Sequence, residues 1–270
     1  MSCFMNSWVR STLALVVAAS FSVGAANAAQ LLDDFSDLND TANPAWFHLG
    51  GNANFPSGGN TLPGQVWDAS TGQYHLSAPN NGYNLAPFGQ LGFIGSRLND
   101  VLTDTRVRAT YVGATAPTGL GYGVMARANA SNGFNALQAY QYSYDALAGE
   151  MILGKITGLS LGDFGSQPVV FDFVNKDYTF ELNVTATHLH GRVYEVGGGI
   201  IANKSIPIGN AGAVIASGRP GVWGYSAAAF GVGIDYTIDN FEARVPEPGT
   251  GLLLAFGATG AVMLRRRFLQ

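Results

Sequence analysis

Three tyrosines on alternate positions, Tyr140, Tyr142 and Tyr144, have the spacing of a binding surface. Alternate side chains of a β-strand share one face, so the three phenol rings would form a row. Such a row could stack against pyranose sugars, with the hydroxyl groups reaching polar partners. The opposite face of this expected strand would carry Ala139, Gln141 and Ser143, of which Ala139 and Ser143 are small rather than polar. This favours the interpretation that the tyrosine row faces the protein core, and a sugar-binding platform is the alternative.

Two histidines are also spaced for chemistry. His188 and His190 alternate on one expected strand, so both imidazoles would point the same way and could share a transition metal. The other two histidines, His48 and His75, show no pairing with them in the sequence. A polar strand face made of His188, His190 and Arg192 is therefore the favoured interpretation.

The sequence lacks the local motifs of several enzyme classes. No Gly-x-Ser-x-Gly elbow is present, so a hydrolytic serine has no local support. Gly119, Gly121 and Gly123 are spaced like a nucleotide-binding loop. They continue into an alternating strand rather than a helix, so a phosphate would find no helix N-terminus there. Glycines where two backbones pack closely are the better interpretation.

The elements that would carry these side chains are predominantly strands. Apolar and polar residues alternate in several short runs, namely 106–112, 120–126, 178–184, 189–193 and 234–238. Clusters rich in glycine, asparagine and proline separate such runs, at 56–60, 79–82 and 197–199. Many short alternating strands separated by such turn-forming clusters predict an all-β, antiparallel jelly-roll sandwich. We assign it to residues 29–244.

The charge of this central region limits the partners it could have. Residues 29–244 contain 10 lysines and arginines against 17 aspartates and glutamates, a net charge of −7. An acidic chain without a basic patch argues against nucleic acid as a partner. The single cysteine, Cys3, lies near the start of the chain. A processed protein would therefore have no thiol and no disulfide.

The beginning of the chain has the pattern of an export signal. Arg10 precedes an apolar stretch from Leu13 to Val23, and the small residues Ala26 and Ala28 follow in a small-x-small cleavage pattern. We predict a signal peptide at residues 1–28, because the apolar stretch is short for a membrane span. An uncleaved anchor is the alternative.

The end of the chain, residues 245–270, has the pattern of a membrane stop signal. It opens with Val245, Pro246, Glu247 and Pro248, whose prolines exclude a regular helix across the junction. The apolar run that follows, 249–264, would span about 24 Å as a single transmembrane helix. It ends in the consecutive arginines Arg265, Arg266 and Arg267, which resist translocation and stay on the cytoplasmic side.

This order of Pro-Glu-Pro, apolar helix and terminal arginines resembles the PEP-CTERM sorting signal of exported proteins of Gram-negative bacteria. The resemblance implies processing by an exosortase-type enzyme in a cell that makes exopolysaccharide. It also implies a protein held first in the inner membrane by its C-terminal helix and later found at the cell surface or outside the cell. A plain single-pass anchor is the alternative, and the Pro-Glu-Pro triplet favours the sorting signal over it.

The central region resembles the concanavalin A-like, laminin G-type jelly rolls. The matching pieces, in chain order, are Leu32–Phe35, Trp46, Gly121–Val124, Tyr178–Leu182, Gly191–Tyr194, Gly218–Trp223 and Ile238–Phe241. The resemblance implies that the first and last strands pair, which would bring Asp33 and Asp34 near Asp239. Carboxylate oxygens are the ligands that calcium prefers, so calcium is the candidate cofactor. Turn formation by these aspartates is the alternative.

Glucanases of this kind carry their catalytic carboxylates close together on one strand, in a Glu-x-Asp-x-Glu pattern. The present sequence has no such run, and it is therefore expected not to be an enzyme. We expect an exported, non-catalytic surface or matrix protein that binds exopolysaccharide. A divergent glycan-active hydrolase and a purely structural surface domain are the alternatives.

Overall fold

A computed structural model describes residues 30–42, 44–50, 64–79, 83–85, 89–113, 117–129, 137–158, 160–227 and 231–245. The region from Gln30 to Val245 forms one compact unit. The signal peptide expected at 1–28 and the sorting signal after Val245 lie outside the described residues. Within the described ranges, no helix has the length and apolar character needed to cross a membrane.

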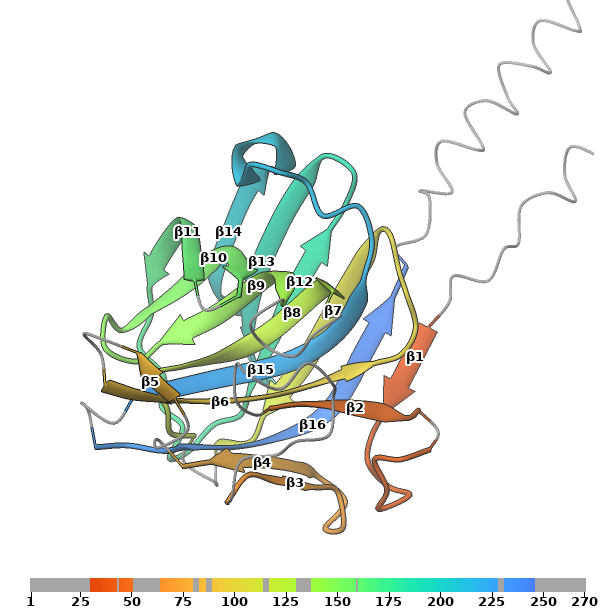
Figure 1. The fold of residues 1–270 in the computed structure, drawn as a ribbon, viewed down its shortest axis with the longest axis vertical. Coiled ribbons are helices and arrows are strands. Elements are labelled where there is room, and N and C mark those ends of the chain that lie inside the picture. Colours follow the sequence, from red (N-terminus) through yellow and green to blue (C-terminus); the bar gives the residue numbers. More distant parts are fainter. Residues whose placement is uncertain are drawn as a thin grey trace, which may run out of the picture. The chain divides into compact units, whose positions relative to one another are not determined.

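The described strands form two eight-stranded antiparallel sheets (Figure 1). The first sheet contains β14 (Ile200–Pro207), β13 (His188–Glu195), β12 (Tyr178–Val184), β7 (Thr105–Tyr111), β16 (Ile234–Arg244), β4 (Tyr74–Ala78) and β3 (Val66–Asp68) in that order, with β1 (Gln30–Asp33) on β16. The second sheet contains β11 (Ser160–Pro168), β10 (Glu150–Thr157), β9 (Gln138–Asp145), β8 (Gly121–Asn129), β15 (Arg219–Ala227), β6 (Gly89–Leu98) and β2 (Trp46–Gly50), with β5 (Tyr83–Leu85) on β6. A short 3-10 helix, Ile208–Ala211, follows β14. The prediction of an all-β antiparallel sandwich is confirmed.

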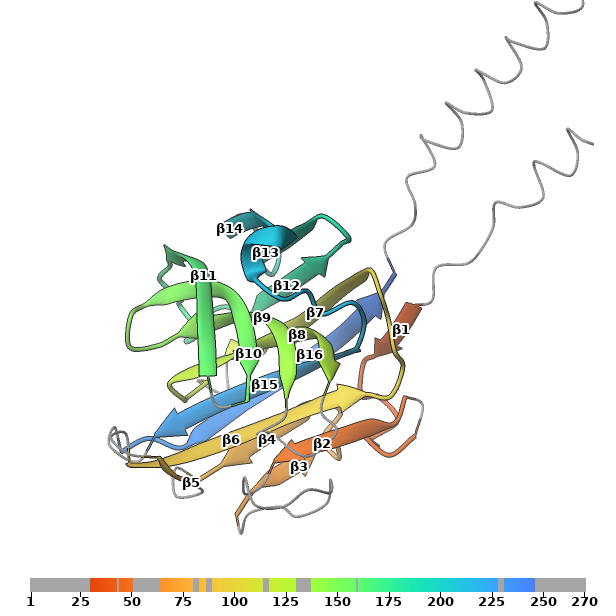
Figure 2. The same ribbon diagram turned by 45° about the horizontal axis from the view of Figure 1, so that its top comes forward.

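Alternation along the strands decides which side chains fill the sandwich. In β7, Val107, Ala109 and Tyr111 are fully buried, whereas the residues between them are only partly buried. The neighbouring strand β12 contributes Phe180 and Leu182, which are also fully buried. Fully burying a large apolar side chain stabilises a fold by about 1.5–3 kcal/mol. The period-two pattern therefore places the main core between the two sheets, which face each other in two views (Figure 2).

The second sheet buries residues on its other face as well. Phe93, Met125, Ala139 and Trp223 belong to a separate apolar cluster and are at most 2% exposed. Each of them alternates with a residue of the main core, as Trp223 does with Val222. We call this side of the second sheet its outer face.

The first and last strands of the sandwich lie side by side. β1 pairs antiparallel with β16, with Gln30 opposite Arg244 and Asp33 opposite Phe241. This is the pairing that the resemblance to concanavalin A-like jelly rolls implied, and it is confirmed. The two ends of the described region therefore meet at one place on the first sheet (Figure 1).

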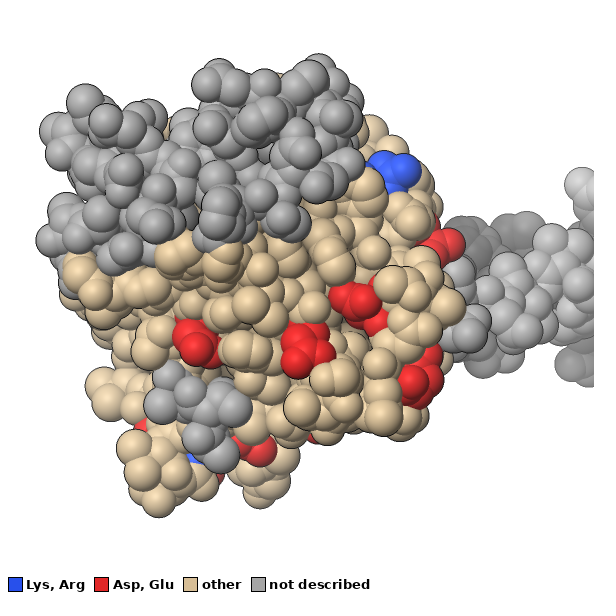
Figure 3. All heavy atoms as spheres, turned by 60° about the horizontal axis from the view of Figure 1, so that its bottom comes forward, with Lys and Arg blue, Asp and Glu red and all other residues tan. Residues whose placement is uncertain are grey.

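The surface agrees with the acidic composition. In one view of the molecule, aspartate and glutamate side chains are spread over the face, where lysine and arginine are scarce (Figure 3). Such a face would repel a polyanion at low ionic strength, because like charges close together are unfavourable.

Candidate functional site

The tyrosine row on β9 packs inside the sandwich. Tyr140 and Tyr142 are fully buried in the main core, and Tyr144 is partly buried against it. The Tyr142 ring lies over Gly191 of the opposite sheet, where a β-carbon would come within 2.3 Å of ring atom Cδ2. The Tyr140 hydroxyl accepts a 3.0 Å hydrogen bond from the backbone N–H of Ile215. The row therefore belongs to the core, as the small flanking residues favoured, and it does not form an exposed sugar platform.

The histidines bond to separate partners. His190 Nε2 lies 2.5 Å from Asn203 Oδ1, and His188 Nδ1 lies 3.0 Å from Thr187 Oγ1. Arg192 donates from Nε to His190 at 3.1 Å, which completes the predicted polar strand face. The other two histidines pair with aspartates, His48 with Asp40 at 2.6 Å and His75 with Asp235 at 2.9 Å. No group of three candidate metal-ligating side chains occurs among the described residues.

Asp33, the first residue of the predicted calcium site, lies at the edge of the hydrophobic core. Its side chain is buried, and its two oxygens have different donors. Oδ1 accepts from the backbone N–H of Phe35 at 2.8 Å, and Oδ2 accepts from Trp46 Nε1 at 2.6 Å. Burial raises the pKa of Asp33, and the two hydrogen bonds oppose that shift. These two contacts tie Asp33 to the turn that follows β1 and to Trp46 of β2.

The other two aspartates of that prediction lie near each other, as the pairing of β1 with β16 requires. Burial raises the pKa of Asp239, and the negative charge of Asp34 raises it further. Each accepts a hydrogen bond from a nearby backbone N–H, Asp34 from Ser36 at 3.0 Å and Asp239 from Asn240 at 2.7 Å. Such hydrogen bonds to nearby backbone N–H groups are typical of turn-forming aspartates, which was the alternative to a calcium site. The three aspartates do not converge on one point as metal ligands would.

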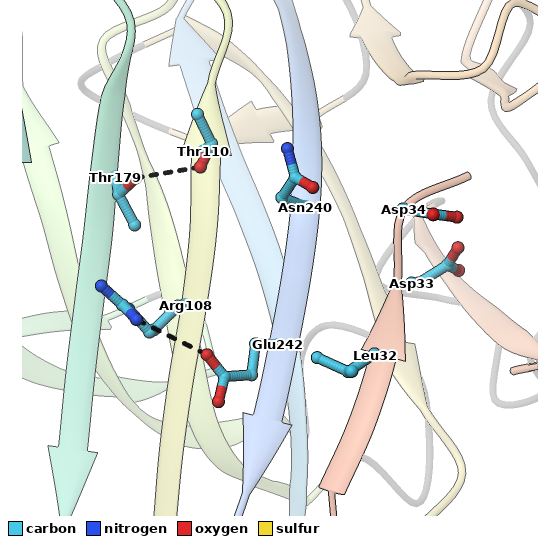
Figure 4. A pocket seen from close by; sticks show the side chains of 8 residues that line it. All are labelled: Leu32, Asp33, Asp34, Arg108, Thr110, Thr179, Asn240 and Glu242. Carbon is cyan, nitrogen blue, oxygen red and sulfur yellow. Dashed lines mark hydrogen bonds and ion pairs between the residues drawn. The ribbon is translucent and has the colours of Figure 1, made fainter. Parts of the chain in front are cut away.

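A groove of about 570 Å³ crosses the first sheet beside these aspartates (Figure 4). It is lined by Leu32, Asp33, Asp34, Arg108, Thr110, Thr179, Asn240 and Glu242. Thr110 and Thr179 share a 2.9 Å hydrogen bond across neighbouring strands, and Arg108 and Glu242 form an ion pair in the same view. Polar groups thus reach the groove from four strands of the sheet.

Ion pairs connect the charged side chains beside this groove. Arg108 lies between Glu181 of β12 and Glu242 of β16, with nitrogen–oxygen distances of 3.2 and 3.6 Å. Three more arginines complete the row, Arg106 and Arg244 on Glu242 and Arg192 on Glu181. Every arginine of the row thus contacts a glutamate, and the pairs that join different strands stabilise the strand register.

The outer face of the second sheet offers a different kind of pocket. It has a volume of about 150 Å³ and is lined by Gln141, Ser143, Tyr144, Asp145, Ile152, Leu161, Gly162, Asp163 and Tyr225. Gln141, Ser143 and Asp145 are alternate residues of β9. They occupy the positions between the tyrosines, so the alternation that buries the tyrosines also directs these polar groups outward.

Gln141 contributes an amide group to this pocket. Its side chain is 1% exposed, and its Oε1 accepts a 3.0 Å hydrogen bond from the Ser143 hydroxyl. The amide nitrogen carries two further N–H donors, from which a ligand oxygen can accept.

Tyr225 supplies the aromatic wall. Its ring stacks on Trp223, with centroids 5.6 Å apart and planes at 9°, and also lies 6.1 Å from the Phe93 ring. A β-carbon at Gly121 would come within 2.2 Å of Tyr225 Cε1, so the missing side chain makes room for the ring. Burial raises the pKa of Tyr225 to about 12, which keeps its hydroxyl protonated at neutral pH.

The glycines that resemble a nucleotide loop serve this packing. A β-carbon at Gly123 would come within 2.3 Å of the carbonyl oxygen of Tyr142 on the neighbouring strand. The interpretation that glycine permits close backbone approach is confirmed for Gly121 and Gly123.

Two carboxylates complete the pocket, Asp145 from β9 and Asp163 from β11. Each also accepts from backbone N–H groups of its own turn, Asp145 from Leu147 at 2.9 Å and Asp163 from Gly165 at 2.6 Å. An aromatic ring, an amide donor, a hydroxyl and carboxylate acceptors in one pocket can bind a ligand rich in hydroxyl groups. This set could not be found from the sequence, because its residues come from different strands, β9, β10, β11 and β15.

The comparisons with known proteins bear on the fold. No family model matches the sequence, and no curated protein matches it. A GH43 protein from Bacillus licheniformis superposes with a TM-score of 0.51 at 8% identity, over 80% of this chain and 39% of that chain. A β-glucanase from Bacillus licheniformis gives 0.49 at 10% identity, over 81% and 99%. The basic winged bean lectin with Tn antigen gives 0.48 at 9% identity, over 76% and 99%.

The likeness to the GH43 protein shows a shared fold and nothing about activity, because the sequences are only 8% identical. Together with two stacked antiparallel sheets and the pairing of β1 with β16, it shows an antiparallel β-sandwich of two sheets.

Proposed function

We propose that this protein is a non-catalytic carbohydrate-binding protein whose site is the pocket on the outer face of the second sheet. The observation that carries the proposal is the lining of this pocket, where the aromatic ring of Tyr225 occurs together with the Gln141 amide, the Ser143 hydroxyl and two carboxylates. A sugar complements such a lining. Its hydroxyl oxygens accept from an amide, and its apolar ring face packs on an aromatic ring.

The site is small, which indicates what kind of carbohydrate contact it makes. A pocket of about 150 Å³ has room for part of one sugar unit, and not for a whole oligosaccharide. A polysaccharide would place one unit in the pocket and leave its neighbours outside it. We therefore propose exopolysaccharide as the ligand class.

We further propose that the protein is exported and sorted through its tail. The support is in the sequence: a signal peptide at 1–28, and Pro246, Glu247 and Pro248 before an apolar run and three arginines. An exosortase-type enzyme would process this tail after the inner membrane has held it, and the sandwich would then reach the surface or the surrounding matrix. Mass spectrometry of the mature C-terminus checks this. An end near Pro246–Pro248 supports sorting, and an intact Gln270 contradicts it.

The binding proposal is tested by electrophoresis of the purified protein through gels that contain single polysaccharides. Retardation by one or more glycans, relative to a non-binding protein of similar charge, is the expected result. Equal mobility in every gel would favour the purely structural alternative. Because the method reads binding alone, it does not depend on any catalytic step.

A glycan hydrolase is the second candidate, and one observation favours it. Asp145 and Asp163 line the same pocket. Most glycoside hydrolases use a pair of carboxylic residues that flank the scissile bond. New reducing ends released from a bound glycan would establish this activity. They should be lost in Asp145→Asn and in Asp163→Asn. A glycan that binds and stays intact would support the non-catalytic proposal.

A further inference from the structure

Arg97, on the outer face of the second sheet, is a buried cation without an anion. It lies on β6 and is 5% exposed. Its guanidinium lies over the Phe47 ring, 4.3 Å from the centroid. Two of its nitrogens, Nε and Nη1, are buried and have no hydrogen-bond partner. Burying a charge is costly unless it is paired, so this group has an unmet requirement for an acceptor.

The body of the chain does not supply that acceptor. Among the described residues, no carboxylate forms an ion pair with Arg97. The internal segments that the structure does not describe are Asn43, Leu159, 51–63, 80–82, 86–88, 114–116, 130–136 and 228–230. None of these segments contains an aspartate or a glutamate. None of them could therefore neutralise the guanidinium with a carboxylate side chain.

A second arginine increases the positive charge at this place. Arg97 is opposite Gly221 on β15, and Arg219 lies two residues before Gly221, where the pairing of β15 with β8 shifts register. Arg219 is half-buried and donates from Nε to the Asn99 carbonyl at 3.1 Å, and it too lacks a carboxylate partner among the described residues. Burial lowers the pKa of Arg97 to about 10, with a smaller contribution from the positive charge of Arg219, so Arg97 stays cationic at neutral pH.

Trp223, which lies on the same face of the second sheet, has another unpaired N–H donor. Trp223 is opposite Gly95, one pleat away from Arg97, and its Nε1 is buried without a partner. The unsatisfied groups here are N–H donors, and their natural complement is a ligand that carries several oxygen acceptors and negative charge.

We propose that the protein binds an acidic polysaccharide, and that Arg97 with the half-buried Arg219 holds the carboxylate of a uronic acid unit. This inference rests on the proposed carbohydrate-binding function and names its ligand class. A planar guanidinium matches a carboxylate through two parallel hydrogen bonds. A carboxylate bound there would supply the acceptor that the buried guanidinium lacks.

The test compares three probes on the purified protein: polygalacturonate, a neutral β-glucan, and sodium sulfate alone. Calorimetry should show that polygalacturonate binds more tightly than the neutral glucan and weakens as salt increases, because exposed charges are screened. Arg97→Gln should lose about tenfold in affinity for polygalacturonate. Arg97→Lys should recover only part of it, since an ammonium lacks the planar fork.

The matched control is Lys176→Gln, which removes one positive charge from an exposed pair with Glu195 and should leave affinity unchanged. If Arg97→Gln fails to fold by circular dichroism, the half-buried Arg219→Gln takes its place and should weaken binding in the same direction.

The outcomes separate this inference from the proposed function. Equal affinity for acidic and neutral glycans, or full affinity in a folded Arg97→Gln variant, overturns the inference while carbohydrate binding stands. If no glycan binds but sulfate raises the unfolding temperature of the wild type and not of Arg97→Gln, the oxyanion site stands and carbohydrate binding fails. No binding of any probe overturns both.

Discussion

Oδ2 of Asp33 accepts a 2.6 Å hydrogen bond from the indole N–H of Trp46, and this bond joins the first sheet to the second. The Trp46 ring in turn packs on Phe241 at 4.7 Å and on Tyr74 at 5.2 Å between centroids. Asp33, which was predicted as a calcium ligand, thus positions an aromatic ring of β2 that packs against β4 and β16 of the first sheet.

Replacing Asp33 should therefore weaken the fold. Asp33→Ala leaves two N–H donors without an acceptor, and we expect it to lower the free energy of unfolding by about 1–3 kcal/mol in urea titrations. Asp34→Ala is the matched control and should change stability little, because Asp34 is exposed. Added calcium should leave both unfolding curves unchanged. A calcium-dependent rise in stability that Asp33→Ala abolishes would restore the metal site.

The charged row of the first sheet should contribute more than an exposed ion pair does. Arg108→Ala removes the group between Glu181 and Glu242, and Glu181 is only 3% exposed. We expect a loss of about 1.5–3 kcal/mol in the free energy of unfolding. Lys176→Ala, which breaks the exposed pair with Glu195, should cost at most about 1 kcal/mol. Equal losses in the two variants would show that the row has no special role in stability.

The buried tyrosines should make the protein unfold in alkali. Burial raises the pKa of Tyr111, Tyr142 and Tyr236, and it raises that of Tyr225 to about 12, from an ordinary value of 10.0. The unfolded chain therefore gives up these protons first, and stability falls as pH rises above 10.0. Tyrosinate absorbance and loss of the strand signal in circular dichroism should rise together in one transition. Gradual ionisation in a chain that keeps its strands would contradict this.

The close fit of Tyr225 over Gly121 can be tested separately. In Gly121→Ala the new β-carbon would meet the Tyr225 ring, which must then move away from Gln141. We expect weaker glycan binding in a folded protein. Gly209→Ala is the control, since a β-carbon there meets nothing within 4 Å. Unchanged affinity in Gly121→Ala would mean that the ring is not part of the site.

Alternation along short runs was enough to predict the architecture. Val107, Ala109 and Tyr111 identify one strand and its buried face, because a strand of a sandwich must bury every second residue. The small residues beside the tyrosines on β9 likewise indicated that Tyr140 and Tyr142 face a core. The resemblance to concanavalin A-like jelly rolls added the pairing of the first and last strands.

The site could not be predicted in the same way, because it depends on which strands are neighbours. Gln141 and Tyr225 are far apart in the sequence, and only the order β9, β8, β15 brings them into one pocket. The pairing of β6 with β15 and β2 places Arg97 over Phe47, where no carboxylate of the described residues forms an ion pair with it. Nothing in the local sequence pattern distinguishes Arg97 from Arg108, which forms ion pairs with two glutamates.

The most direct test of carbohydrate binding at this pocket is isothermal titration calorimetry of the retarding glycan with Gln141→Ala and Gln138→Ala. Both variants shorten a glutamine of β9, but Gln141 is buried beside the pocket and Gln138 is exposed. We predict that Gln141→Ala loses about tenfold in affinity, as the loss of one well-placed hydrogen bond implies, while Gln138→Ala binds as the wild type does. Equal affinity of both variants and the wild type would contradict the account.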